Sequence, residues 1–205
     1  MTRIIGGRAG GRRLATPRGQ DTRPTSDRVR EALFSAVESW CGSLSGLRVL
    51  DLYAGSGAVG LEAWSRGAAA VTFVESDRRT AAVVRANAQA VGCDHAQVLA
   101  TSVAAALSRP SDRPVDLVFS DPPYPLPTPR VVSDLEALRD HGWLVPGALV
   151  VVERSVRGEP LAWPEGFEEG RRRRYGETVL CYGHAGPAGR SPEAASEAEE
   201  ASDEQ

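Results

Sequence analysis

Four consecutive residues, Asp121, Pro122, Pro123 and Tyr124, combine groups suited to chemistry on a weakly nucleophilic amine. The lone pair of an exocyclic base amine is delocalised into its ring, and two acceptors aimed at the N–H bonds would redirect it. The carboxylate of Asp121 can be one acceptor, and the carbonyl of Pro122 the other, because the proline rings fix its direction. Tyr124 offers a flat face for an extruded base. These four catalytic candidates predict group transfer to a base amine.

A glycine-rich turn, Gly55-Ser56-Gly57, follows an apolar run and is suited to binding a cofactor. Glycines here let the backbone leave a strand, approach a ligand and enter a helix. The spacing also fits a dinucleotide fingerprint, so a nicotinamide or flavin cofactor is an alternative. Asp51 would repel a pyrophosphate but suits the amino group of a methionine moiety, which favours S-adenosylmethionine. Glu75, at the end of the next apolar run, fits the ribose diol of either cofactor.

Apolar runs alternate with helical patterns from residue 47 to 153, which predicts a parallel sheet covered by helices on both faces. Residues 171–175 and 178–182 flank Gly176-Glu177 and predict an antiparallel hairpin at the end of the sheet. Ligands of such sheets lie beyond the carboxyl ends of the strands, so the tetrapeptide and the glycine turn should be neighbours. The predicted strands are 48–53, 70–75, 97–100, 115–120 and 148–153, and the predicted helices are 58–66, 78–91 and 129–140, with a brief helix after the third strand.

Three segments are expected along the chain. Residues 1–25 form a basic arm with a small β-hairpin at 3–5 and 12–15, too rich in Gly and Pro to build a core. Residues 26–183 form the catalytic domain, and residues 184–205 form a disordered acidic tail with almost no large apolar residue. The first helix begins near Ser26 or Asp27, and its predicted buried positions are Val29, Leu33, Val37 and Trp40.

The charge is distributed unevenly. All 24 basic residues are arginines, and eight of them lie in the first 30 residues, which suits a polyphosphate partner. A run of four arginines at 171–174 is either a second contact of that kind or a solvated strand edge. The candidate contacts with such a polyphosphate are Arg8, Arg12, Arg13, Arg23, Thr25 and Arg28.

Other classes of protein are disfavoured. Cys41, Cys93 and Cys181 are far apart and form no C-x-x-C pair, so we expect neither a disulfide framework nor a metal site. No apolar run approaches the roughly 20 residues needed to cross a bilayer. The N-terminus carries no apolar signal segment, and we expect a cytoplasmic location.

The strings at residues 3–7, 22–25 and 28–34, together with the two motifs, resemble the RsmD family of bacterial 16S rRNA (guanine(966)-N(2))-methyltransferases. The resemblance runs from about residue 3 to 183. It implies a Rossmann-like class I methyltransferase fold with a mostly parallel seven-stranded sheet, S-adenosylmethionine as cofactor, and methylation of a guanine N2 amine in 16S rRNA. Asp121 to Tyr124 would be catalytic, and Ser102 stands where many methyltransferases place an aspartate against the adenine amine. The implied cofactor contacts are Asp51, Ala54, Gly55, Gly57, Glu75 and Ser102.

The residues alone leave rival functions open. The tetrapeptide suits adenine N6 or cytosine N4 of DNA equally well, although no second domain is left to recognise a DNA sequence. A protein glutamine amide poses the same chemical problem, but the basic arm disfavours it. An RNA-binding ribosome assembly factor is a further alternative. The expected partner is 16S rRNA in an assembling or assembled small ribosomal subunit, bound by a monomer.

Overall fold

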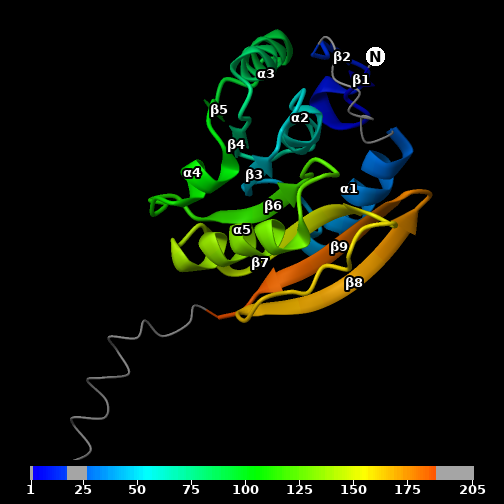
Figure 1. Ribbon diagram of the computed structural model, residues 1–205. Helices are drawn as coiled ribbons and strands as arrows, with labels where there is room; N and C mark the ends of the chain where they lie inside the picture. The colour runs from blue at the N-terminus through cyan, green and yellow to red at the C-terminus, as the bar shows by residue number, and fades with distance from the viewer. Residues whose placement is uncertain (1, 18–26, 188–205) are drawn as a thin grey trace, which may run out of the picture.

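The computed structural model describes residues 2–17 and 27–187, and its centre is a seven-stranded sheet with the order β5-β4-β3-β6-β7-β9-β8 (Figure 1). The strands β3 to β7 run parallel to one another, and β9 pairs antiparallel with both β7 and β8. This confirms the predicted α/β architecture with its C-terminal hairpin. The strands are β3 (Arg48–Leu52), β4 (Ala70–Val74), β5 (Ala96–Leu99), β6 (Val115–Ser120), β7 (Leu144–Ser155), β8 (Phe167–Tyr175) and β9 (Thr178–Ala185).

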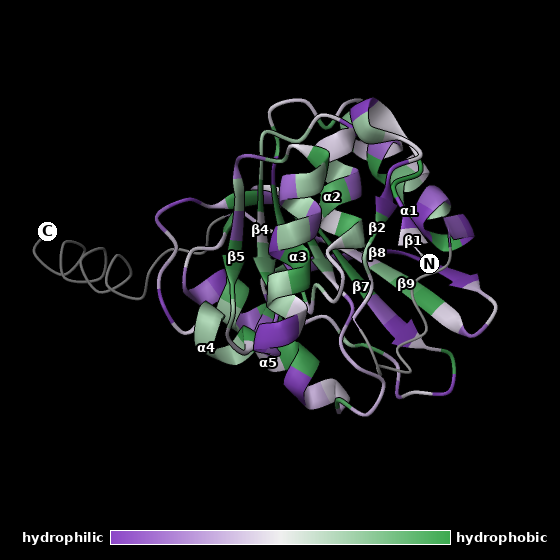
Figure 2. Cartoon of the chain, turned by 90° about the horizontal axis from the view of Figure 1, so that it is seen from above, coloured by the Kyte–Doolittle hydropathy of each residue, from purple (hydrophilic) through white to green (hydrophobic). Residues whose placement is uncertain are grey.

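Helices cover both faces of the sheet and produce two apolar cores. One core packs against α1, α2 and α3, and the other packs against α4 and α5. Neighbouring strand residues such as Val49 and Leu50 enter opposite cores, which is why these strands are continuously apolar. The helices carry both hydrophobic and hydrophilic residues (Figure 2). They are α1 (Asp27–Cys41), α2 (Ala58–Ser65), α3 (Arg78–Val91), α4 (Val103–Leu107) and α5 (Thr128–Asp140), with a short 3-10 turn, η1 (Gly7–Ala9). In the described part of the chain, no helix combines the length and apolarity that a membrane crossing requires.

Two sequence-based expectations need correction. Trp40 was expected in the buried face of α1, but 37% of its surface is exposed, and Arg30 and Phe34 are buried in that face instead. The acidic tail was expected to begin at residue 184, but His184 and Ala185 still belong to β9 and pair with β8. The rest of the predicted tail, 188–205, lies outside the described residues, as do 18–26.

The N-terminal arm forms the predicted hairpin, in which β1 (Thr2–Arg3) pairs antiparallel with β2 (Arg13–Leu14). Contrary to expectation, it contributes to a core, because Ile4, Ala9 and Leu14 are buried among residues of α1 and α2. A Cβ on Gly7 would lie only 2.0 Å from the Ser65 carbonyl oxygen. Glycine at this position therefore permits backbone contact between the arm and α2.

A buried carboxylate attaches the arm to α2. Glu62 is fully buried and accepts hydrogen bonds from the amides of Ile5 (2.6 Å) and Gly6 (2.8 Å), and from Nε of Arg66 (2.8 Å). Arg30, on α1, is also buried, and its Nη2 donates to the Arg3 carbonyl and to Asp27, both at 2.7 Å. Charged groups inside the protein thus satisfy the backbone of the arm.

We predict that Glu62→Ala lowers the free energy of unfolding by about 3 to 5 kcal/mol, since two arm amides and Arg66 lose a buried acceptor. For a chain of this size that corresponds to a fall in Tm of roughly 6 to 20 °C, measurable by calorimetry. The matched control is Glu38→Gln, because Glu38 binds the same Arg66 but is 41% exposed. A surface pair contributes about 1 kcal/mol at most, so equal effects of the two substitutions would contradict this role for Glu62.

Candidate functional site

The tetrapeptide and the glycine turn lie at the carboxyl ends of two adjacent strands. β3 and β6 are neighbours, with Leu52 paired to Ser120. Asp121, the first residue after β6, donates its amide to the Leu52 carbonyl at 3.4 Å. The structure therefore brings together the two motifs that the sequence separates by about 65 residues.

The glycine turn depends on its glycines for two different reasons. Gly55 and Gly57 have φ values of 55° and 77°, in the left-handed region. A Cβ on Gly57 would lie 2.9 Å from Val84, and one on Gly60 would lie 2.4 Å from Phe73, so packing also requires these two glycines. A Cβ on Gly55 would have no neighbour within 4 Å. The side of the turn at Gly55 is therefore open enough for a ligand to approach the backbone.

Asp51 and Glu75 both hold the backbone of the turn. Asp51 is buried and accepts the Gly60 amide at 2.9 Å, while Glu75 accepts the amides of Gly55 at 3.0 Å and Asp77 at 2.9 Å. Burial raises the pKa of Asp51 to about 7, the Gly60 hydrogen bond opposes this, and the charge of Glu75 adds to it. A bound cation would stabilise the ionised form of such a carboxylate. The acceptors present thus fit the ammonium and ribose of an S-adenosylmethionine-like molecule.

Ser102 has a local structural task. Its Oγ accepts the Ala105 amide at 3.2 Å and caps α4, directly after β5. Asp77 caps α3 in the same way, accepting the Thr80 amide at 2.7 Å. Ser102 thus lies at the carboxyl end of the sheet, while the hydrogen bond it makes belongs to its own helix.

The tetrapeptide exposes its functional groups. Pro122 is buried, whereas Asp121, Pro123 and Tyr124 are exposed, Tyr124 to 55%. The chain turns immediately afterwards, since the Leu126 amide donates to the Pro123 carbonyl at 2.8 Å. Tyr124 is therefore available as a stacking surface.

Arg154, which sequence reasoning missed, holds the loop that follows the tetrapeptide. It is 9% exposed, extends from β7, and donates to the Leu126 carbonyl from both terminal nitrogens (3.3 Å) and to Thr128 Oγ1 (3.0 Å). A lone arginine at the end of an apolar strand gives a weak sequence signal. The hydrogen bonds of Arg154 show that a side chain of the neighbouring strand, β7, holds this loop in place.

Tyr53, also missed, directly follows β3 in an uncommon conformation. Its φ of 59° makes it the only non-glycine residue with positive φ in 2–17 and 27–187. Its hydroxyl donates to Asp134 of α5 at 2.5 Å, and burial together with this bond raises the pKa of Tyr53. Backbone strain of this kind is concentrated at functional sites, and here it adjoins both motifs.

Asn87 connects the arm to the glycine turn. It is buried in α3, donates to the carbonyls of Ser56 and Ala15, both at 2.9 Å, and accepts the Ala15 amide at 2.8 Å. One amide side chain therefore fixes the end of the arm relative to the turn.

The proposed RNA contacts differ in their surroundings. Arg8 donates twice to the Trp64 carbonyl and lies 4.3 Å above the Trp64 ring, so it serves to attach the arm. Arg12 makes one long bond, 3.4 Å, to the Ala90 carbonyl. Arg13 and Arg28 are exposed. The remaining two candidates, Arg23 and Thr25, lie outside the described residues.

Potential metal ligands are scattered over the described residues. Nowhere in 2–17 and 27–187 do three His, Cys, Asp or Glu side chains gather closely enough to hold an ion. Cys41, Cys93 and Cys181 are free thiols, and burial raises the pKa of Cys93 to about 11. These cysteines therefore fill space as neutral side chains.

Comparison with known proteins gives consistent matches. A family model described as Conserved hypothetical protein 95 matches residues 2–184. Ribosomal RNA small subunit methyltransferase D of Escherichia coli (strain K12) is 38% identical over 159 residues, 75% of each chain. Its namesake in Haemophilus influenzae is 37% identical over 168 residues, 80% of this chain and 84% of that protein. A solved structure of yhhF from Escherichia coli, described as a candidate methyltransferase, superposes with a TM-score of 0.79 at 32% identity, covering 90% of this chain and 97% of that one.

We predict that Asn87→Leu lowers the free energy of unfolding by about 1 to 3 kcal/mol, because three part-buried hydrogen bonds from the buried Asn87 side chain to the backbone of Ala15 and Ser56 are lost. Hydrogen exchange should accelerate at the Ala15 amide and not in α4, which serves as the internal reference. Asn87→Asp keeps the acceptor for Ala15 and loses both donors, so it should leave that amide more protected than Asn87→Leu does. Unchanged exchange at Ala15 in Asn87→Leu would refute the link.

Proposed function

Because the chain belongs to the RsmD family of methyltransferases, we propose that it methylates the exocyclic N2 amine of a guanine in small-subunit (16S) ribosomal RNA, with S-adenosylmethionine as methyl donor. The observation that carries the proposal is the position of the tetrapeptide beside the glycine turn, at the ends of adjacent strands. Amine acceptors and a cofactor cradle thus meet at the crevice where ligands of such sheets bind.

In this proposal the turn and its carboxylates hold the cofactor. Bound S-adenosylmethionine supplies a methyl group already activated on a sulfonium. Asp51 would bind the ammonium of its methionine part, and Glu75 would bind the ribose hydroxyls. The open side of the turn at Gly55 would let the cofactor come close to the backbone, and Ala54 and Gly57 complete the turn. The bonds from Asp51 and Glu75 to backbone amides support this assignment, because they fix both carboxylates before any ligand binds.

The tetrapeptide holds the target amine. The carboxylate of Asp121 and the carbonyl of Pro122 accept its two N–H bonds, so that the nitrogen lone pair points away from the base plane. Tyr124 stacks on the extruded base, Pro123 stiffens the loop, and Arg154 restrains the segment that follows. Positioning accounts for most of the rate enhancement, since the donor is already activated.

The basic arm holds the RNA backbone. Arg12 and Arg13 lie on the arm and Arg28 lies on α1, and all three are exposed. Arginine suits phosphate because its planar fork donates two hydrogen bonds at once. Arg23 and Thr25, which lie outside the described residues, are assigned to the same RNA contact in this proposal. Arg8 contributes indirectly, since its guanidinium is bound to the Trp64 carbonyl.

The function is tested by transfer of tritium from labelled cofactor to purified small subunits, large subunits, tRNA and DNA, followed by nucleoside analysis. We expect label in N2-methylguanine of small-subunit RNA. Asp121→Ala should reduce turnover by roughly 100-fold or more, by analogy with the loss of one preorganised polar contact, with unchanged cofactor affinity. Asp121→Asn keeps a carbonyl acceptor and should retain more activity than Asp121→Ala. Label in DNA alone, or full activity of Asp121→Ala, would refute the proposal.

Cofactor binding should depend on pH through Asp51. Because the ammonium binds the ionised carboxylate, and the pKa of Asp51 is about 7 in the free protein, affinity for S-adenosylhomocysteine should weaken about tenfold from pH 8 to pH 6. Calorimetry measures this, with Asp51→Asn as the variant that binds weakly at both pH values. Binding of NAD instead of S-adenosylhomocysteine would contradict the cofactor assignment.

The stability of the free protein has the opposite dependence. The pKa of Asp51 is higher in the folded chain than its ordinary 3.8, so the folded state binds the proton more tightly. The resulting stabilisation is fully present below about pH 4 and is lost as pH rises through about 7. The Tm of the wild type should therefore fall as the pH rises through about 7, and Asp51→Asn, which cannot titrate at this position, should lack this contribution to the fall.

A further inference from the structure

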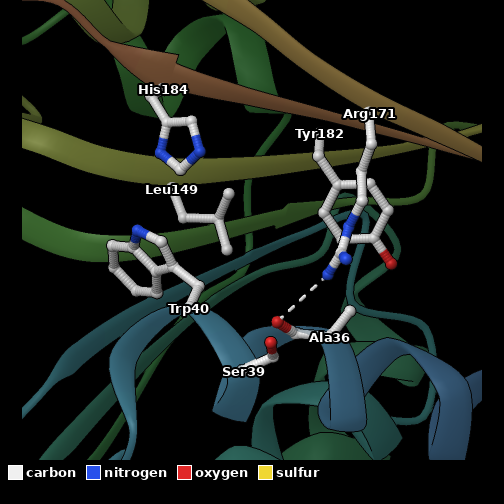
Figure 3. A pocket seen from close by; sticks show the side chains of 7 residues that line it. All are labelled: Ala36, Ser39, Trp40, Leu149, Arg171, Tyr182 and His184. Atoms are coloured by element: carbon white, nitrogen blue, oxygen red, sulfur yellow. Dashed lines mark hydrogen bonds between the residues drawn. The ribbon is translucent and has the colours of Figure 1, made fainter.

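A pocket lies on the α1 side of the sheet, lined by residues of α1, β7, β8 and β9 (Figure 3). Its volume is about 310 Å³, at the lower end of the range for small-ligand sites. Leu149 at its base pairs with Leu117, four residues before Asp121 on β6. At about 3.3 Å per residue the pocket lies roughly 13 Å from the tetrapeptide along the strands, so a base bound there is not the target base.

The pocket combines aromatic rings with a guanidinium. Trp40, from the end of α1, faces His184 of β9 with ring centroids 6.1 Å apart. Trp40 and Tyr124 are the two large hydrophobic side chains exposed in residues 2–17 and 27–187. Tyr124 is explained by the target base, whereas nothing in the catalytic site explains Trp40.

Arg171 closes the other side of the pocket. Its guanidinium lies 5.1 Å above the Tyr182 ring and donates one hydrogen bond, of 3.3 Å, to the Ala36 carbonyl. That bond uses one of five N–H donors. Neighbouring arginines of the run are engaged elsewhere, since Arg172 binds Glu169 and the Leu161 carbonyl, and Arg174 binds the Gly176 carbonyl. The run 171–174 therefore places one guanidinium in the pocket.

We propose that this pocket binds an unpaired nucleotide of the RNA substrate outside the target site, with its base stacked on Trp40 and its phosphate held by Arg171. Proteins that bind single-stranded nucleic acids commonly place an aromatic ring, on which a base stacks, beside a positively charged group that binds the phosphate. Glu168 is the residue opposite His184 in the register of β8 and β9, so its negative charge makes the His184 side of the pocket less suited to a phosphate than the Arg171 side. The inference rests on the proposed function, which supplies RNA as the substrate.

The test compares the affinity of full-length variants for unmethylated 16S rRNA by filter binding at two salt concentrations. Trp40→Ala should weaken binding about 5- to 150-fold, the range for losing one base stack, and Trp40→Phe should restore most of it. Arg171→Gln should make the slope of log affinity against log salt shallower by about 0.7. Turnover at saturating RNA and affinity for S-adenosylhomocysteine should not change.

Arg174→Gln is the matched control, because it removes the same charge from the same strand outside the pocket. Its RNA affinity should exceed that of Arg171→Gln. Thermal unfolding identifies any variant that is misfolded, and Trp40→Leu then replaces Trp40→Ala. The inference is overturned if Trp40→Ala and Arg171→Gln bind RNA as the wild type does, or if they lose only binding to the intact subunit, which would indicate a protein partner. Methyl transfer by the wild type, measured separately, shows whether the proposed function itself holds.

Discussion

The order of strands reverses between β3 and β6, and this reversal determines where the site can form. From β3 the chain moves outward through β4 and β5, then returns to place β6 on the other side of β3. The connections leave the carboxyl ends of these strands in opposite directions, which opens a crevice between them. The glycine turn leaves β3 and the tetrapeptide leaves β6, so both line the crevice. No other pair of adjacent parallel strands in the described sheet diverges in this way.

The positions of these motifs follow from packing on either side of the crevice. Gly57 and Gly60 bring α2 against Phe73 and Val84, so the turn cannot shift without opening the core. On the other side, Arg154 and the Tyr53–Asp134 hydrogen bond connect β7, β3 and α5 around the loop of the tetrapeptide. The crevice is thus bounded by groups that have little freedom to move. Such preorganisation is what catalysis by positioning requires.

The sequence predicted most of the sheet because buried strands are continuous apolar runs that end in recognisable motifs. β6 and α3 begin and end where the patterns place them. The buried residues that the sequence did not predict share one property. Glu62, Arg30 and Arg154 are charged residues that are buried with their partners, and hydropathy patterns place such residues at the surface. The prediction for Trp40 was wrong in the opposite sense. Its helical spacing predicted burial, but its side chain is exposed because α1 extends past the edge of its core there. Asn87 could not be predicted, because its partners are backbone groups far away in sequence.

Glu62 and Asn87 also connect the N-terminal arm to the glycine turn. α2 begins at the glycine turn, with Gly57 as its N-cap, and its last turns hold the arm through Glu62 and the Trp64 carbonyl. Asn87 makes the same connection from α3 to Ser56 and Ala15. The arm that we propose to bind RNA is therefore attached at two points to the helices that flank the proposed cofactor site. Glu62, the Trp64 carbonyl and Asn87 thus set the position of the arm relative to the glycine turn.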